Sequence, residues 1–219
     1  MTFQFSPDII LPALLILSAY FIGAIPSAVW IGKLFFNTDV RLNGSCNPGA
    51  TNAFRVLGIK GGIPVLVMDV LKGYGVVQLA YLQDLYRIGD ADFDNFRLTL
   101  GMIAVVGHIF SVYIGFKGGK GVAALLGVFF ALLPWPALLS LGMFVIILLT
   151  TRYVSLGSMC AGIGFPFFTF FLFPPESIYL EGASVLVALL LIFTHRKNIV
   201  RLIKQEESKA NLFLKRRNQ

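Results

Sequence analysis

Long apolar stretches alternate with short polar segments along almost the whole chain. Seven of these stretches are apolar enough to enter a bilayer as helices, although several are shorter than the ~20 residues that a helix needs to cross the hydrocarbon unaided. No segment shows the period-two alternation of a membrane β-barrel strand. The pattern predicts an all-α polytopic membrane protein with seven transmembrane helices. They are expected at residues 9–34, 62–82, 98–115, 122–133, 135–151, 156–173 and 182–194.

Composition supports this prediction. Apolar residues make up 57% of the 219 residues and charged residues only 13%, whereas soluble domains carry about 25% charged residues. The chain is expected to consist of a transmembrane domain at residues 1–195 and a basic cytoplasmic tail at residues 196–219. The tail is interpreted as a segment that contacts anionic lipid rather than nucleic acid, because it directly follows a span.

Basic residues indicate the orientation. With seven spans, the connecting segments fall on two sides of the membrane, and one side holds only Arg87 and Arg97 among several acidic residues. The positive-inside rule then places the N-terminus outside and the C-terminus in the cytoplasm. The basic, cytoplasmic side comprises residues 33–61, 116–121, 152–155 and 195–219.

Three polar loops rich in small residues lie on that predicted cytoplasmic side. In the first loop, glycine allows a close approach to a ligand and Pro48 fixes the turn. Successive backbone N–H groups in such a turn bind anions, and the fork-shaped guanidinium of Arg55 suits phosphate. A plain polar connector is the alternative interpretation. The candidate residues of this loop are Ser45, Asn47, Gly49, Thr51, Asn52 and Arg55.

The second loop, residues 117–121, places two lysines among glycines directly before an apolar helix. It lacks the spacing of a Walker A motif, but it suits a phosphate at a helix N-terminus. A topology anchor is the alternative, which explains the lysines but not the glycines. The candidates are Lys117, Gly118, Gly119, Lys120 and Gly121.

The third loop offers Ser155 and Ser158, although small residues of this kind also serve helix packing in membranes. His195, Arg196 and Asn198 end the last span on the same side. Together, the three loops and this helix end predict an anion site at one membrane face.

Polar residues inside the spans are further candidates, because charge at membrane depth is costly. Asp69 and Lys72 are three residues apart and can pair on one helix face, either to orient the site or as a structural tie. His108 is a candidate general base, a hydrogen-bond donor to phosphate, or a core histidine whose hydrogen bonds are satisfied within the protein.

Several classes of chemistry are not expected. Neither histidine has a second ligand at metal-site spacing, so no metal is predicted, and two cysteines make no disulfide framework. No Cys–His or Ser–His–Asp arrangement is present to form a covalent acyl-enzyme, and no cofactor is expected.

Five motifs in order, spread over nearly the whole chain, resemble the bacterial acyl-phosphate:glycerol-3-phosphate acyltransferases, the PlsY family. Cys46 stands where this family typically has glycine, and Asn43 where it commonly has Ser or Thr. The motifs are GSCNPGATN at 44–52 with Arg55, DVLKG at 69–73, GH at 107–108 with FKGGKGVA at 116–123, SLGS at 155–158 and HRKNI at 195–199.

The resemblance implies transfer of an acyl group from acyl phosphate to the sn-1 hydroxyl of glycerol 3-phosphate, which gives lysophosphatidic acid and phosphate. It implies a seven-span enzyme of the bacterial inner membrane, with the site on the cytoplasmic face and possible functional coupling to the acyl-phosphate-forming enzyme. Ser45, Arg55, His108, Lys117, Lys120 and Ser155 are then catalytic candidates. The substrate-binding candidates are Asn47, Gly49, Thr51, Asn52, Lys72, Gly118, Gly119, Gly121, Ser158, His195, Arg196 and Asn198.

Two other functions fit part of the pattern. A transporter or channel for a phosphorylated small anion would also need broken helices and basic loops, but seven spans give no clean inverted repeat and the loops gather on one side. A structural membrane scaffold would need none of the loop residues.

Overall fold

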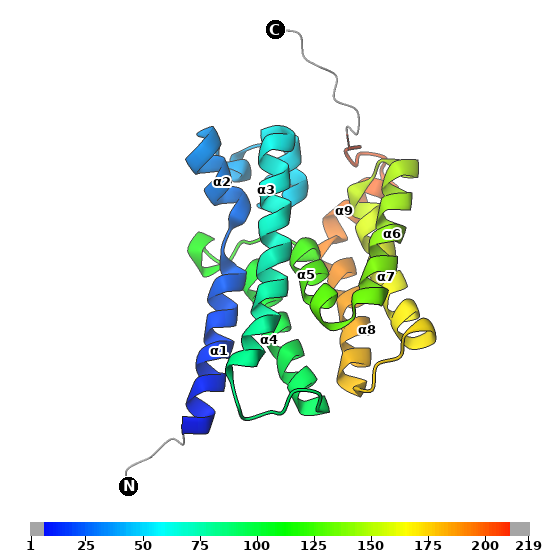
Figure 1. Ribbon diagram of the computed structural model, residues 1–219. Coiled ribbons are helices and arrows are strands. Elements are labelled where there is room, and N and C mark those ends of the chain that lie inside the picture. The colour runs from blue at the N-terminus through cyan, green and yellow to red at the C-terminus, as the bar shows by residue number, and fades with distance from the viewer. Residues whose placement is uncertain (1–6, 211–219) are drawn as a thin grey trace.

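The computed structural model describes residues 7–210, in which all regular elements are helical (Figure 1). Short 3-10 turns follow α2, α3 and α4, and a π-helical turn follows α7. The predicted all-α fold class therefore agrees with the described residues. The α-helices are α1 (Pro7–Ala24), α2 (Ser27–Phe36), α3 (Ala50–Gln78), α4 (Ala91–Ile109), α5 (Val122–Leu132), α6 (Pro134–Thr151), α7 (Val154–Phe167), α8 (Ile178–Thr194) and α9 (Arg196–Ile203).

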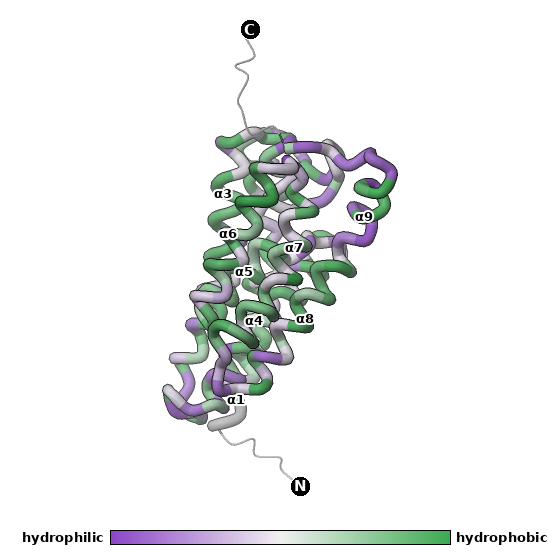
Figure 2. The backbone as a smooth tube through the Cα atoms, turned by 90° about the vertical axis from the view of Figure 1, so that its right-hand side faces the viewer, coloured by the Kyte–Doolittle hydropathy of each residue, from purple (hydrophilic) through white to green (hydrophobic). Residues whose placement is uncertain are grey.

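The helices run roughly along one axis in alternating directions (Figure 1). Helices α1 to α4 form one group, α6 to α9 form another, and α5 lies between them. Apolar residues cover the middle of the long axis and polar residues gather towards its two ends (Figure 2). This distribution is typical of a helical protein whose long axis crosses a bilayer.

The first expected span, residues 9–34, is a bent pair of helices rather than one continuous helix. Helix α1 ends at Ala24, α2 begins at Ser27, and the two are bent by 47°. Pro26 lies in the break, where it has no N–H to donate and its ring blocks a continuing helix. The break leaves carbonyl groups of Ala24 and Ile25 for partners elsewhere in the fold.

Other boundaries shift for local reasons. Helix α3 begins twelve residues before the expected span and contains a kink at Gly58, whose φ of 69° is left-handed. Helix α4 begins at Ala91 and already ends at Ile109, before a 3-10 turn. Helix α7 continues as a π-helical turn at Phe168–Leu172, just after the internal Pro166.

Among the described residues, three helices are long and apolar enough to cross a membrane, or up to five when each bent pair counts as one span. Helix α5 is too short, since 11 residues extend about 16 Å against a hydrocarbon core of about 30 Å. At the C-terminal end of α5, Nη2 of Arg97 donates a hydrogen bond to the carbonyl oxygen of Ala131 at 2.7 Å. This bond gives a partner to a backbone carbonyl group at the end of the short helix. Arg97 also pairs with Asp94 at 2.9 Å.

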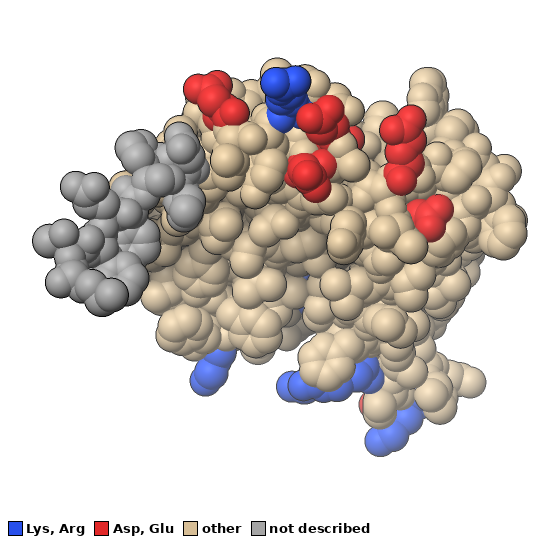
Figure 3. All heavy atoms as spheres, turned by 90° about the horizontal axis from the view of Figure 1, so that it is seen from below, with Lys and Arg blue, Asp and Glu red and all other residues tan. Residues whose placement is uncertain are grey.

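Acidic and basic side chains are separated around the end of the molecule where α1 begins. Seen from that end, Asp and Glu side chains gather along one edge with a basic group among them, and other Lys and Arg side chains lie along the opposite edge (Figure 3). The tail expected at residues 196–219 begins with α9 at the opposite end. Its last nine residues, and residues 1–6, lie outside the described part of the chain.

Glycines let α5 pack directly against α3. A Cβ atom on Gly73 would lie 2.2 Å from the carbonyl oxygen of Ala124, and one on Gly127 would lie 2.0 Å from that of Val70. Small residues at helix contacts are the usual device of membrane bundles, where close van der Waals packing drives association. Helix α5 can therefore approach α3 backbone to backbone.

We expect Gly73→Ala to lower stability, because the added methyl group meets rigid backbone and overpacking typically costs about 1–3 kcal/mol. Gly75 in the same helix is the matched control, since a Cβ there meets no atom within 4 Å. Thermal unfolding of both variants in detergent measures the difference. Equal midpoints for Gly73→Ala and Gly75→Ala would contradict the close contact.

Candidate active site

A cavity of about 800 Å³ lies between the two helix groups. It is lined by all three loops singled out in the sequence and by the junction of α8 and α9. Of the candidate site residues, only Lys72 does not line it. The candidates on its wall are Ser45, Asn47, Gly49, Thr51, Asn52, Arg55, His108, Lys117, Gly118, Gly119, Lys120, Gly121, Ser155, Ser158, His195, Arg196 and Asn198.

The cavity has a basic part and an apolar part. Its wall carries six Lys or Arg side chains and two carboxylates, those of Asp69 and Glu207, so basic groups outnumber acidic ones. Helices α5 to α8 supply apolar wall residues such as Leu125, Phe129 and Phe144. The arrangement suits a ligand with an anionic head and a hydrocarbon chain. The basic residues are Arg55, Lys117, Lys120, Arg196, Lys197 and Arg201.

Asn52 organises the first loop. Its side chain is 1% exposed, accepts a hydrogen bond from the backbone N–H of Ser45 at 2.8 Å, and donates to the carbonyl oxygens of Val40 at 2.7 Å and Asn43 at 3.1 Å. The N-cap residue of α3 is Gly49. The described contacts of Asn52 thus hold the loop in shape, and its role in binding a substrate stays a prediction.

Cys46 occupies a conformation that glycine adopts easily. Its φ is 59°, in the left-handed region that side chains with a Cβ rarely enter. This geometry gives a physical reason for glycine at the corresponding position of the family that the sequence resembles. The thiol is exposed.

The second loop folds back onto the end of α4. The N–H groups of Gly118 and Gly119 donate to the carbonyl oxygens of Ile109 at 2.9 Å and His108 at 3.1 Å. A Cβ on Gly118 would lie 2.0 Å from the carbonyl oxygen of His108, and one on Gly119 would lie 2.2 Å from Nε2 of its ring. Packing on His108 therefore explains these two glycines, and their amides already have protein partners.

Lys120 connects the second loop to α9. Its Nζ donates a hydrogen bond to Oδ1 of Asn198. Burial lowers the pKa of Lys120 to about 8; the Glu207 carboxylate opposes this decrease, while Arg201 and Arg55 add to it. Lys120 therefore loses its charge at a lower pH than an ordinary lysine.

Lys72 lies at the break between α1 and α2 rather than on the cavity wall. Its Nζ contacts Oδ1 of Asp69 and the carbonyl oxygen of Ile25, each at 2.8 Å. Ser27 donates a further hydrogen bond to Asp69 Oδ1 at 2.8 Å. The pair ties α3 to the broken helix, and a contact of Lys72 with substrate stays a prediction.

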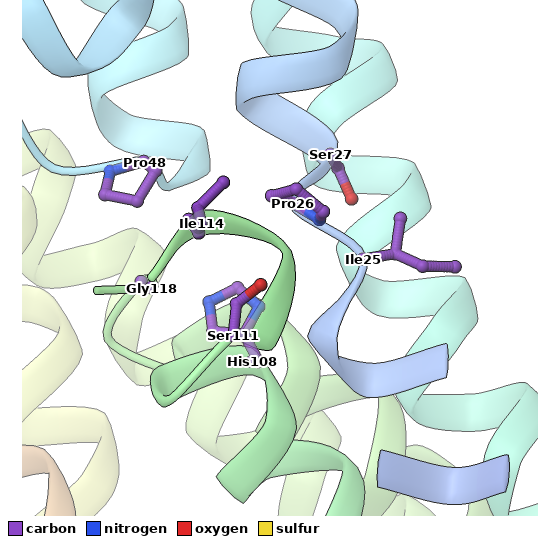
Figure 4. A pocket seen from close by; sticks show the side chains of 9 residues that line it. Ile25, Pro26, Ser27, Pro48, His108, Ser111, Ile114 and Gly118 are labelled. Atoms are coloured by element: carbon purple, nitrogen blue, oxygen red, sulfur yellow. The ribbon is translucent and has the colours of Figure 1, made fainter. Parts of the chain in front are cut away.

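His108 stands between the large cavity and a second, much smaller one. Its Nδ1 is 3.8 Å from Asp69 Oδ1, and its side chain is 7% exposed. The small cavity, of about 10 Å³, lies between the α1–α2 break and the turn after α4, where His108 and Ser111 are close neighbours (Figure 4). It has room for about one water molecule, so of these two cavities the larger is the one with room for a ligand that carries a hydrocarbon chain.

The serines of the third loop have different partners. Ser158 donates back to the carbonyl oxygen of Val154 at 2.9 Å within its own helix. Ser155 donates to Oε1 of Glu207 at 2.7 Å. Glu207 was not among the sequence candidates; the available signal was that Glu206 and Glu207 are the only acidic residues of the basic tail.

Comparison with known proteins identifies the family of the chain. The family model described as "Glycerol-3-phosphate acyltransferase" matches residues 13–205. The chain belongs to the glycerol-3-phosphate acyltransferase family. The sequence resemblance to this family is thereby confirmed.

Members of the family align over almost their whole length. The chain is 47% identical over 194 residues to the glycerol-3-phosphate acyltransferase of Fusobacterium nucleatum subsp. nucleatum, covering 89% of this chain and 95% of that protein. It is 41% identical over 204 residues to the glycerol-3-phosphate acyltransferase of Endomicrobium trichonymphae, covering 93% and 98%.

Two solved structures share the fold, both of PlsY, an integral membrane glycerol 3-phosphate acyltransferase. The glycerol 3-phosphate form is 36% identical with a TM-score of 0.80 and covers 91% of this chain and 96% of that one. The lysophosphatidic acid form is 36% identical with a TM-score of 0.77 and covers 90% and 94%. This chain thus has the helical fold of an integral membrane PlsY protein.

We expect Asn52→Leu to destabilise the family fold at the first loop. Leucine has a similar size but leaves the N–H of Ser45 and two carbonyl oxygens without their partner, and each buried unpaired group costs about 1–3 kcal/mol. The neighbouring Thr51→Val, at an exposed position, is the control. Thermal unfolding in detergent should show a lower midpoint for Asn52→Leu alone; a midpoint equal to that of Thr51→Val would refute this role.

Proposed function

We propose that this protein transfers an acyl group from acyl phosphate to the sn-1 hydroxyl of glycerol 3-phosphate, which yields lysophosphatidic acid and inorganic phosphate. The observation that carries the proposal is the single cavity with six basic side chains in one part and apolar helix walls in the other. Family membership and the two ligand forms of PlsY point to the same substrate class.

Both substrates carry phosphate, and the basic part of the cavity offers two places for it. We place one phosphate beside Lys117, Lys120 and the N-terminus of α5, where unpaired N–H groups favour an anion. The other phosphate lies near Arg55 and His195, and Asn198 stands between the two places because it accepts a hydrogen bond from Lys120. The acyl chain then extends along the apolar wall formed by α5 to α8.

An acyl phosphate is an activated mixed anhydride, so no protein nucleophile is required. The sn-1 hydroxyl oxygen forms the new ester bond to the acyl carbon, and the bond from that carbon to the phosphate oxygen breaks. The hydroxyl proton passes to a phosphate oxygen of the substrates. Positioning of the two substrates and stabilisation of developing charge by the cations supply the rate enhancement.

His108 is the alternative proton acceptor, and its surroundings argue against that role. Nδ1 faces Asp69 at 3.8 Å, and Nε2 lies against Gly119. The ring therefore has neighbours at both nitrogens, which favours a role in shaping the second loop.

We also propose seven membrane crossings in the bacterial inner membrane, with the N-terminus outside and the cavity and C-terminus on the cytoplasmic side. The alternating helix directions in Figure 1 support an odd number of passes when α1–α2 counts as one and α5 as a short one. The basic loops at the cavity end support the orientation through the positive-inside rule. A cytoplasmic site would receive acyl phosphate directly from the enzyme that forms it.

We expect the purified protein to release phosphate and form lysophosphatidic acid from palmitoyl phosphate and glycerol 3-phosphate, but not from palmitoyl-CoA. Mass spectrometry and a phosphate assay measure both products. Turnover with palmitoyl-CoA alone would mean that acyl phosphate is not the acyl donor. No turnover from folded protein, together with uptake of labelled glycerol 3-phosphate into sealed vesicles, would favour an anion transporter instead.

We expect His108→Gln to lower kcat less than tenfold, because the substrate phosphate takes the proton. Loss of a general base typically costs about 10²–10⁴ in rate. Steady-state kinetics of the variant decide whether the substrate phosphate or His108 accepts the proton. The thermal midpoint of the variant is the control for folding. A fall in kcat of that larger size with KM unchanged would assign the proton transfer to His108.

A further inference from the structure

The chain turns back towards the cavity after α9. Gln205 takes a left-handed φ of 59°, and the N–H of Glu206 donates to the carbonyl oxygen of Arg201 at 2.8 Å. The returning segment is then fixed to the turn between α6 and α7, where the N–H of Ala210 donates to the carbonyl oxygen of Arg152 at 2.7 Å. This path brings Glu207 to the cavity wall.

One carboxylate oxygen of Glu207 joins two elements of the site. Oε1 accepts hydrogen bonds from Ser155 Oγ at 2.7 Å and from Asn198 Nδ2 at 2.6 Å. Oδ1 of the same Asn198 side chain accepts from Lys120. Glu207 thus fixes which end of the Asn198 amide faces Lys120, and it links α7, α9 and the second loop.

The charges around the cavity give this carboxylate a further effect. Asp69, the other acidic residue of the wall, is paired with Lys72 at 2.8 Å. Glu207 is therefore the carboxylate on the described cavity wall that offsets part of the charge of the six basic side chains there. Because a carboxylate repels a phosphate dianion, it contributes through the groups that it orients.

We propose that Glu207 is a positioning residue of the phosphate site, which holds Ser155, Asn198 and Lys120 in the arrangement that binds glycerol 3-phosphate. This inference rests on the proposed function. In this arrangement Ser155 and Lys120 contact the phosphate. Glu207 contacts Ser155 directly and reaches Lys120 through Asn198.

The proposal has a signature in the pH dependence. The groups that face Lys120 are Glu207, Arg201, Arg55 and His195. Burial lowers the pKa of Lys120 to about 8, and Glu207 is the carboxylate that opposes this decrease. Phosphate binding needs charged Lys120, so kcat/KM falls as pH rises through that pKa. Without the Glu207 charge the pKa of Lys120 is lower still, and the decline begins at lower pH.

The test compares Glu207→Gln with Glu206→Gln in the full chain, two neighbouring substitutions that remove the same charge. Glu206 is exposed. With palmitoyl phosphate as donor, we expect Glu207→Gln to raise KM for glycerol 3-phosphate about tenfold, equivalent to about 1.4 kcal/mol, and to move the alkaline decline of kcat/KM to lower pH. Glu206→Gln should match the parent protein, and Glu207→Asp, which keeps the charge, should retain the parent's alkaline decline.

Several outcomes would overturn the proposal. One is parent-like KM and pH dependence in Glu207→Gln, and another is an equal change in both glutamine variants. A lower KM in Glu207→Gln would mean that the carboxylate competes with the substrate. If Glu207→Gln folds poorly, Glu207→Asp is tested in the Lys120→Arg background instead. Arginine stays charged over the pH range, so Glu207→Asp should leave the pH profile of that background unchanged. A shift of the profile would refute the role. A parent protein without turnover would instead refute the proposed function.

Discussion

Interrupted helices in a membrane must find hydrogen-bond partners for the backbone groups that each break releases, because the hydrocarbon offers none. In this fold the partners come from other helices. Lys72 donates to the carbonyl oxygen of Ile25, and Ser111 donates to that of Ala24 at the same break. Arg97 donates a hydrogen bond to the carbonyl oxygen of Ala131 at the end of α5. The breaks are thus also the places where the helices are tied to one another.

The same requirement shapes the site. Helix α4 ends at the cavity wall, and its last carbonyl groups accept hydrogen bonds from the N–H groups of Gly118 and Gly119. The loop that makes these bonds carries Lys117 and Lys120 to the cavity wall and ends where α5 begins. Since α5 is short and closely packed on α3, its N-terminus stays beside the loop. Backbone satisfaction and anion binding therefore depend on one segment.

Sequence alone located the polar loops but not all the contacts between them. Proline was an ambiguous signal, since Pro12, Pro64 and Pro166 lie inside helices whereas Pro26 ends one. Neighbouring elements decide which proline a bundle tolerates. The Ser155–Glu207 contact joins residues 52 positions apart, and no spacing rule covers such a pair. The motifs, by contrast, are local, and they led to the correct family.

The glycines of the second loop show how one sequence signal has two physical causes. Glycine beside lysine is typical of a phosphate loop, where the backbone approaches the ligand. Gly118 and Gly119 are instead required because the loop packs against His108 without room for a Cβ. Their amides face protein, so in the proposed site the phosphate contacts of this loop come from the lysine side chains and the start of α5. Under that proposal, anion binding depends on charge held in place by packing, and the orientation of Lys120 matters more than the loop's backbone.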